Sequence, residues 1–187
     1  FHMASPSGRY TVIQPPDLFK LVIYDGNRPV VTVPLEGDIV FSPDSRYAYY
    51  LSPSVRVTRL DLQTRQTQSV MDIPDVSFLQ QISPDGRYLV AQATDKARPS
   101  GAEHTPSSES TLLILDLQTR RLYRFPNIWT TTDSFLDNRH LVVRYRPFGP
   151  EGPAVFYFLD TATMRMANAR PFWGFSTEST PLIAHHT

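Results

Sequence analysis

A pair of turn motifs occurs four times along this chain and constrains its fold more than any other feature. The first motif reads Ser-Pro-Asp-Gly-Arg-Tyr in its clearest copy, at residues 83–88. The arginines of its four copies are Arg9, Arg46, Arg87 and Arg139, which lie 37, 41 and 52 residues apart. Repeats of about this length are typical of the blades of a β-propeller. We therefore predict four copies of one supersecondary unit.

The second motif follows each copy of the first and reads Leu-Asp-Leu-Gln-Thr-Arg at residues 60–65 and 115–120. The stretches between motifs are short and rich in Val, Ile, Leu, Tyr and Phe, which favours strands over helices. In the turns, proline presets the backbone, aspartate bonds nearby amides and glycine accepts a positive φ angle. Each repeat thus predicts a four-stranded antiparallel blade. The blades are expected at about residues 6–35, 36–74, 75–127 and 128–175.

Residues 83–90 together with 112–119 closely resemble the WD40-like Pro-Asp repeats of bacterial propellers. The resemblance implies an all-β propeller, and it extends over nearly the whole chain. Such repeats occur in TolB-like proteins, in propellers attached to peptidases, and in surface or sensor proteins. The motif is structural, so the resemblance implies a fold and carries no activity with it.

The two ends of the chain suggest how the propeller closes. The first repeat lacks a strand before Ser5, and residues 180–187 form an extra segment after the fourth repeat. We expect this segment to be the closing strand of the first blade, so that strand exchange between the termini gives a four-bladed ring. An eight-bladed ring of two chains and an open part of a larger propeller are the alternatives. Residues 1–5 resemble a cloning scar and are left outside the predicted domain, 6–187, which we expect to be excised from a longer protein.

Composition excludes several classes of function. Eighteen basic residues balance eighteen acidic ones, so no overall field attracts nucleic acid. The chain has no cysteine, which excludes disulfides, thiolate metal sites and cysteine nucleophiles. No apolar run approaches the roughly 20 residues that span a bilayer, so we expect membrane contact only through segments outside this chain. The compartment is left open, with a periplasmic or other extracytoplasmic location favoured over the cytoplasm.

Motifs for catalysis or cofactor binding are missing from the sequence. The string Gly-Phe-Ser-Thr-Glu at residues 174–178 departs from the Gly-x-Ser-x-Gly nucleophile motif at its last residue. The histidines do not have metal-ligand spacing, and no glycine-rich phosphate loop occurs. We therefore predict no catalytic residues, no metal and no cofactor.

Three segments are candidates for binding a partner. Insertions at residues 95–110 and 146–153 interrupt the third and fourth blades at the same strand connection, so both should leave the same side of the propeller. The aromatic segment 170–175 follows the last confident strand and could anchor a partner. Tolerated surface loops and packing between blades are the alternative explanations. The candidate binding residues are Arg98, His104, Phe148, Trp173 and Phe175.

The repeated arginines have two interpretations. They could form a ring that binds an anion, or they could pack within their own blades. Because an arginine recurs in every blade, the second interpretation is favoured.

Taken together, these patterns favour a non-catalytic recognition propeller that binds a protein or peptide, as the binding or sensory domain of a larger bacterial protein. A homodimer is also consistent with the sequence. The alternatives are a propeller attached to a peptidase or other hydrolase, and a structural or oligomerisation domain with a large exposed apolar patch.

Overall fold

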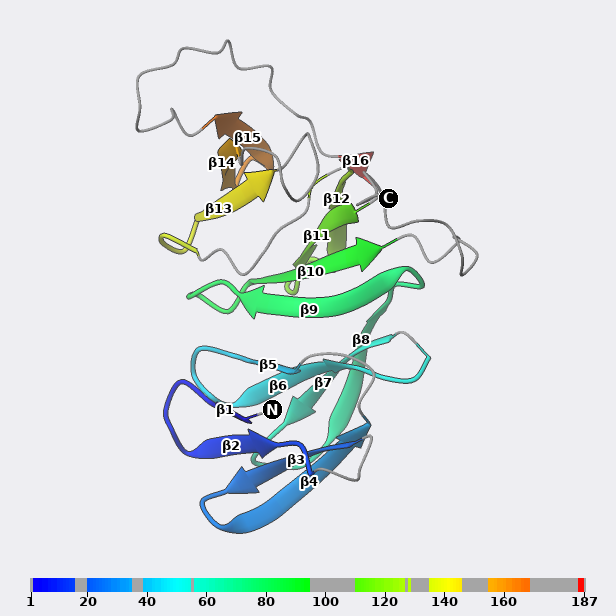
Figure 1. The fold of residues 1–187 in the computed structure, drawn as a ribbon, viewed down its shortest axis with the longest axis vertical. Coiled ribbons are helices and arrows are strands. Elements are labelled where there is room, and N and C mark those ends of the chain that lie inside the picture. Colours follow the sequence, from blue (N-terminus) through cyan, green and yellow to red (C-terminus); the bar gives the residue numbers. More distant parts are fainter. Residues whose placement is uncertain are drawn as a thin grey trace.

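Four antiparallel β-sheets follow one another along the chain in the computed structural model, stacked along its long axis (Figure 1). The structure describes residues 2–15, 20–34, 39–54, 56–94, 110–126, 128, 135–145, 155–168 and 185–186. Every sheet is a meander in which consecutive strands pair. The predicted all-β, propeller-type fold is therefore confirmed.

The first two sheets each contain four strands. The first holds β1 (His2–Ala4), β2 (Tyr10–Ile13), β3 (Lys20–Asp25) and β4 (Arg28–Pro34). The second holds β5 (Ile39–Phe41), β6 (Tyr47–Leu51), β7 (Arg56–Asp61) and β8 (Thr67–Asp72).

The third and fourth sheets continue the series. The third holds β9 (Val76–Ile82), β10 (Tyr88–Thr94), β11 (Ser110–Asp116) and β12 (Arg121–Phe125), with β16 (His185–His186) added beside β12. The fourth holds β13 (His140–Tyr145), β14 (Val155–Asp160) and β15 (Arg165–Asn168). An isolated bridge between Phe135 and Leu141 lies where the first strand of the fourth repeat was expected.

The core lies between successive sheets, because side chains alternate between the two faces of a strand. In the third sheet, Leu89 and Leu113 pack toward the second sheet, whereas Val90 and Leu112 pack toward the fourth. Three apolar clusters join the first sheet to the second, the second to the third and the third to the fourth. The two inner sheets are therefore covered on both faces.

The predicted turn chemistry is present in the first motif. Gly8 and Gly86 have φ angles of 74° and 75°, and Ser45 takes the same position in the second repeat with a φ of 57°. In each of these turns the third residue after the motif's serine donates its backbone N–H to that serine's carbonyl at 2.8–2.9 Å. Glycine is favoured at this position because the left-handed conformation costs other residues free energy, which Ser45 bears in the second repeat.

The N-terminal residues that we left outside the fold belong to it. β1 pairs with β2, with Met3 opposite Val12, and Met3 packs against the first apolar cluster. Ser5 is buried and donates its backbone N–H to the Tyr10 carbonyl at 2.8 Å. The prediction that the first repeat lacks its first strand is wrong, because β1 fills that position.

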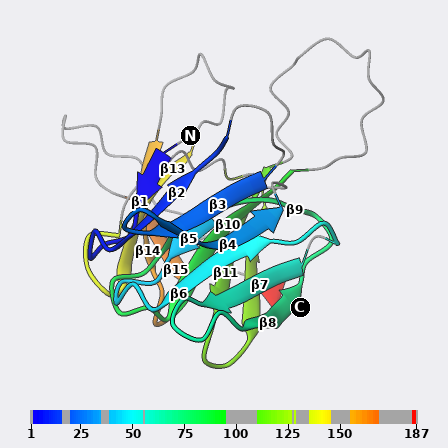
Figure 2. The same ribbon diagram turned by 90° about the horizontal axis from the view of Figure 1, so that it is seen from below.

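The C-terminal strand also pairs differently from our expectation. β16 lies antiparallel to β12 of the third sheet, with His186 opposite Tyr123 and His185 opposite Arg124. β16 thus forms the edge of the third sheet beyond β12, whereas the first sheet already has its four strands. Within the described ranges no apolar cluster joins the first and fourth sheets, which lie at opposite ends of the stack (Figures 1 and 2). Closure of the ring within one chain stays a prediction.

None of the described segments is a helix of the length and apolar character that crossing a bilayer requires.

The left-handed turn conformation gives a stability prediction. Replacing Gly86 by Ala should lower the free energy of unfolding by about 1 kcal/mol, because a side chain disfavours this φ angle. A Cβ at this position would meet only Pro43 Cδ, at the ordinary contact distance of 3.7 Å, so crowding adds little. Urea unfolding monitored by circular dichroism measures the change.

Gln118→Ala is the matched control, since this turn residue is exposed and its φ is not positive. It should change stability by less than about 0.5 kcal/mol. Equal stabilities of the Gly86→Ala variant and the wild type would contradict the role assigned to this turn.

Candidate functional site

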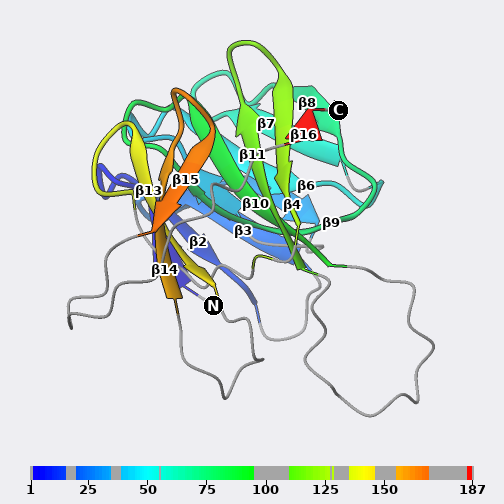
Figure 3. The same cartoon turned by 90° about the horizontal axis from the view of Figure 1, so that it is seen from above.

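Strand direction places two kinds of connection at opposite edges of the sheets. The turns between first and second strands, and between third and fourth strands, share one edge, seen at the upper side of Figure 3 for β11–β12 and β14–β15. We call this the clamp edge. Connections between second and third strands leave the opposite edge, which we call the loop edge. It is defined by the strand ends Ile13 and Lys20, Leu51 and Arg56, Thr94 and Ser110, and Tyr145 and Val155.

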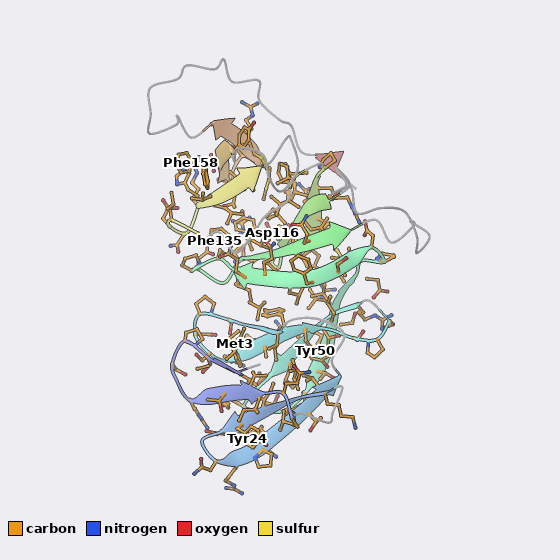
Figure 4. The ribbon with its side chains drawn as sticks, in the orientation of Figure 1. Met3, Tyr24, Tyr50, Asp116, Phe135 and Phe158 are labelled. Carbon is orange, nitrogen blue, oxygen red and sulfur yellow. The ribbon has the colours of Figure 1, made fainter. Side chains whose placement is uncertain are left out.

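The clamp edge is named for an arginine–aspartate pair that is most buried in the third sheet. Arg87 Nη2 donates to Asp116 Oδ2 at 2.8 Å, and Arg87 Nε donates to the same oxygen at 3.2 Å. Asp116 Oδ1 accepts the backbone N–H groups of Gln118 and Thr119 at 2.9 and 3.1 Å. The guanidinium carbon of Arg87 also lies 4.9 Å from the centre of the Tyr88 ring. This one carboxylate therefore ties the two motif turns of its sheet together; Figure 4 labels Asp116.

The same pair occurs in the other three sheets. Their salt bridges join Arg9 to Asp25, Arg46 to Asp61 and Arg139 to Asp160, at 2.7, 3.4 and 2.5 Å. Arg9 and Arg46 stack on the tyrosines that follow them, each at 5.0 Å. The fourth repeat has His140 at the tyrosine position, and its Nδ1 lies 2.8 Å from Asp137 Oδ2. Each arginine is thus engaged within its own blade, which confirms the structural interpretation over the anion ring.

The pairing sets the charge state of these carboxylates. Burial opposes ionisation of Asp116, but the hydrogen bond from Arg87 and the two backbone amides outweigh it, so the net pKa is lowered. The hydrogen bond from Arg139 holds the pKa of Asp160 well below its ordinary range. Hydrogen bonds from His140 and from backbone amides lower the pKa of Asp137 to about 2. These aspartates are therefore ionised at physiological pH, and Asp116 and Asp160 form ion pairs with Arg87 and Arg139.

A hollow of about 570 Å³ lies on the face of the fourth sheet that points away from the third. Its lining includes Leu136, His140, Phe158, Arg165, Met166 and Ala167. Leu136 and Phe158 are 62% and 38% exposed, and Figure 4 places Phe158 at the upper end of the stack. This apolar surface was missed from the sequence. The sequence feature that could have indicated this surface is the placing of Phe156 and Phe158 on one face of β14. The same spacing occurs on faces that another sheet covers, so it does not reveal exposure.

The five residues proposed from the sequence lie outside the described residues. They are Arg98, His104, Phe148, Trp173 and Phe175. The described strands on either side of the segments that carry them end at the loop edge, with Thr94, Ser110, Tyr145, Val155 and Asn168 as their last or first residues.

In the described part of the chain, no group of three or more His, Asp or Glu side chains is arranged to hold a metal ion.

Burial of the aspartate should determine how much each arginine–aspartate pair of the clamp edge stabilises the fold. Asp116→Ala should lower the free energy of unfolding by about 1–3 kcal/mol, because it leaves two part-buried N–H groups and Arg87 without their acceptor. Asp25→Ala removes the exposed version of the same pair and should leave the unfolding temperature nearly unchanged, since exposed ion pairs stabilise little. Thermal unfolding of both variants measures the difference, and equal losses would contradict this dependence on burial.

The lowered carboxyl pKa values predict acid sensitivity. The folded protein keeps these aspartates ionised to lower pH than the unfolded chain does, so below about pH 4 the unfolded chain binds more protons. The stability that Asp137 contributes is present above its ordinary pKa of 3.8 and is lost as the pH falls toward about 2. The unfolding temperature should decline through this window, and Asp137→Asn should make the decline shallower. An unchanged slope in this variant would contradict the assignment.

Comparison with known proteins identifies the fold of this chain but does not assign it to a family. No protein-family model matches the chain, and no curated protein sequence matches it. TolB from Acinetobacter baumannii is similar in structure, with 16% identity, a TM-score of 0.50, and 89% of this chain aligned to 40% of that one. Acylaminoacyl peptidase from Pyrococcus horikoshii is similar in two crystal structures. The uncomplexed form has 13% identity, a TM-score of 0.58, and 90% of this chain aligned to 29% of that one. The orthorhombic form has 12% identity, a TM-score of 0.56, and coverages of 89% and 29%.

Both of these proteins contain β-propeller domains. The chain spans well under half the length of either. At these identities the similarity concerns the fold alone. The chain therefore has the β-propeller fold that TolB and acylaminoacyl peptidase contain.

Proposed function

We propose that this chain is a non-catalytic recognition unit built from WD40-like Pro-Asp repeats, which binds a protein or peptide at its loop edge. The arrangement of the two edges carries the proposal. At the clamp edge the arginine of the first motif is paired with the aspartate of the second motif in every sheet. At the loop edge lie the strand ends that flank the segments which interrupt the repeat. Variation in length at one edge of a regular scaffold is typical of a binding surface.

The residue types in these segments suit a peptide ligand. Arg98 and His104 can donate hydrogen bonds to carboxylates, and Arg can do so in a bidentate manner. Phe148, Trp173 and Phe175 are side chains of the kind that anchor interfaces. We therefore propose a ligand segment that combines acidic and apolar side chains.

The similarity to TolB concerns the fold alone, and it supports the proposal only in that the two proteins share a propeller scaffold. We also propose an extracytoplasmic location, because the repeats resemble the WD40-like Pro-Asp repeats of TolB-like proteins.

Selection from a library of random peptides displayed on phage tests the proposal. The immobilised chain should enrich a peptide family, whose affinity is then measured by isothermal titration calorimetry. Alanine variants of Arg98, Phe148 and Trp173 should each be compared with the wild type, and at least two should weaken binding tenfold or more.

Gln63→Ala and Gln118→Ala, on exposed turns of the clamp edge, are the controls and should bind like the wild type. Normal binding by every loop-edge variant would refute the placement of the site. Failure to enrich any peptide family would refute peptide recognition itself.

A propeller attached to a hydrolase is the second candidate, favoured by the similarity to acylaminoacyl peptidase. In that case a catalytic domain outside this chain would perform the reaction, and the loop edge would face it. The natural full-length protein should then hydrolyse an N-acetylated peptide anilide while this chain alone does not. Absence of hydrolysis by the full-length protein would remove this candidate.

A further inference from the structure

The exposed large hydrophobic side chains of the described residues gather on the two terminal sheets. Leu136, Phe156 and Phe158 belong to the fourth repeat and are 62%, 44% and 38% exposed. Ile13, at the end of β2 in the first sheet, is 38% exposed. The two inner sheets carry none in the part of the chain that is described. The apolar surface of the stack is therefore concentrated at its two ends.

Strand register shows that Phe156 occupies a position which is buried in the second and third sheets. Phe156 lies four residues before Asp160 of its sheet and pairs with Arg144. In the third and second sheets the residues four before the equivalent aspartates, Asp116 and Asp61, are Leu112 and Val57. Both of those side chains are 0% exposed, because the next sheet covers them. The outer face of the fourth sheet thus has the side chains of an inter-sheet junction without the covering sheet.

The first sheet presents the opposite half of such a junction. Leu21 and Ile23 point toward the second sheet, so Val22 and Tyr24 lie on the outer face together with Ile13. The register equivalent of Ile13 is Tyr50 in the second sheet and Ala91 in the third, and both are buried against the preceding sheet. Figure 4 shows Tyr24 and Phe158 at opposite ends of the molecule.

We infer that two copies of this chain associate head to tail, with the outer face of the fourth sheet of one copy packed on the outer face of the first sheet of the other. The contact would continue the junction that occurs three times within the chain. The hollow beside Phe158 would receive apolar side chains of the partner's first sheet, in the manner of the internal junctions.

Symmetry explains why a second copy is the fitting occupant. Each copy offers one fourth-sheet face and one first-sheet face, so a pair related by a two-fold axis forms two identical junctions and leaves neither face open. A ring closed in this way contains eight sheets and covers Phe156 and Phe158 of one copy and Ile13 of the other. This inference concerns sheet faces and is independent of the peptide site proposed at the loop edge.

Light scattering after size-exclusion chromatography tests the inference on the chain itself. The wild type should have twice the mass of one chain at micromolar concentration. Phe158→Asp and Ile13→Asp, which each place a charge in one half of the junction, should both be monomers, with dimer dissociation constants raised at least 100-fold. Ser69→Asp, on an exposed position of β8, is the matched control and should remain a dimer.

Mixing the two monomeric variants gives the sharpest readout. The Phe158→Asp copy keeps an intact first-sheet face, and the Ile13→Asp copy keeps an intact fourth-sheet face. One undamaged junction should therefore form, and the mixture should contain a species of twice the chain mass that neither variant forms alone. Both variants should retain the wild-type circular dichroism spectrum, because the substituted side chains are exposed in the single chain.

Three outcomes would overturn the inference. A monomeric wild type would do so, and a large loss of stability in monomeric Phe158→Asp would then indicate that the first sheet of the same chain covers this face. A dimer that withstands both substitutions would place the contact elsewhere. A dimer broken by Phe158→Asp but not by Ile13→Asp, with no rescue on mixing, would indicate a contact between two fourth sheets.

Discussion

Burial of apolar side chains between successive sheets is the interaction on which this structure depends. A single four-stranded meander has two faces, and in the inner sheets both faces carry residues such as Leu113 and Ile114 that are fully buried. Removal of this area from water supplies the main free energy of folding, at about 25 cal/mol per Å². No sheet of this kind can satisfy both faces alone. The stack is therefore stable only as a series, and its two ends carry the remaining apolar surface.

The clamp edge serves this packing by keeping each sheet in one register. Asp116 accepts hydrogen bonds from Arg87 and from the turn that follows it, so the ends of β10 and β11 stay aligned. A slip of one residue would send Leu89 and Leu113 to the opposite face of the sheet. The ion pairs thus help to select one strand register, and each arginine and its aspartate neutralise one another within one blade.

The two proposed contacts differ in their physical character. The loop edge offers segments of varied length and polarity, which suits recognition of different ligands on one scaffold. The terminal faces offer flat apolar sheets whose partner is another sheet of the same kind. Association through the terminal faces would leave the loop edge free, because the strands run from the clamp edge to the loop edge and not from one face to the other. The molecule could therefore assemble and bind a ligand at the same time.

The sequence by itself determined the repeating unit, because the interactions that define it are local. The turn at residues 83–88 closes through bonds between Ser83, Asp85, Arg87 and Tyr88, all within six residues, so its copies could be recognised without a structure. The sequence favoured packing of the repeated arginines within their own blades, but Asp116 as the partner of Arg87 was shown only by the structure, since the repeat pattern does not show which acceptor an arginine meets. Strand pairing at the termini was decided only by the tertiary structure. β1 was set aside with the N-terminal residues although it leads into the first motif turn, and β16 has no turn motif beside it, so the sequence did not indicate its partner. Exposure of Phe156 and Phe158 was likewise decided by the tertiary structure, because alternation along a strand is the same whether or not another sheet covers the face.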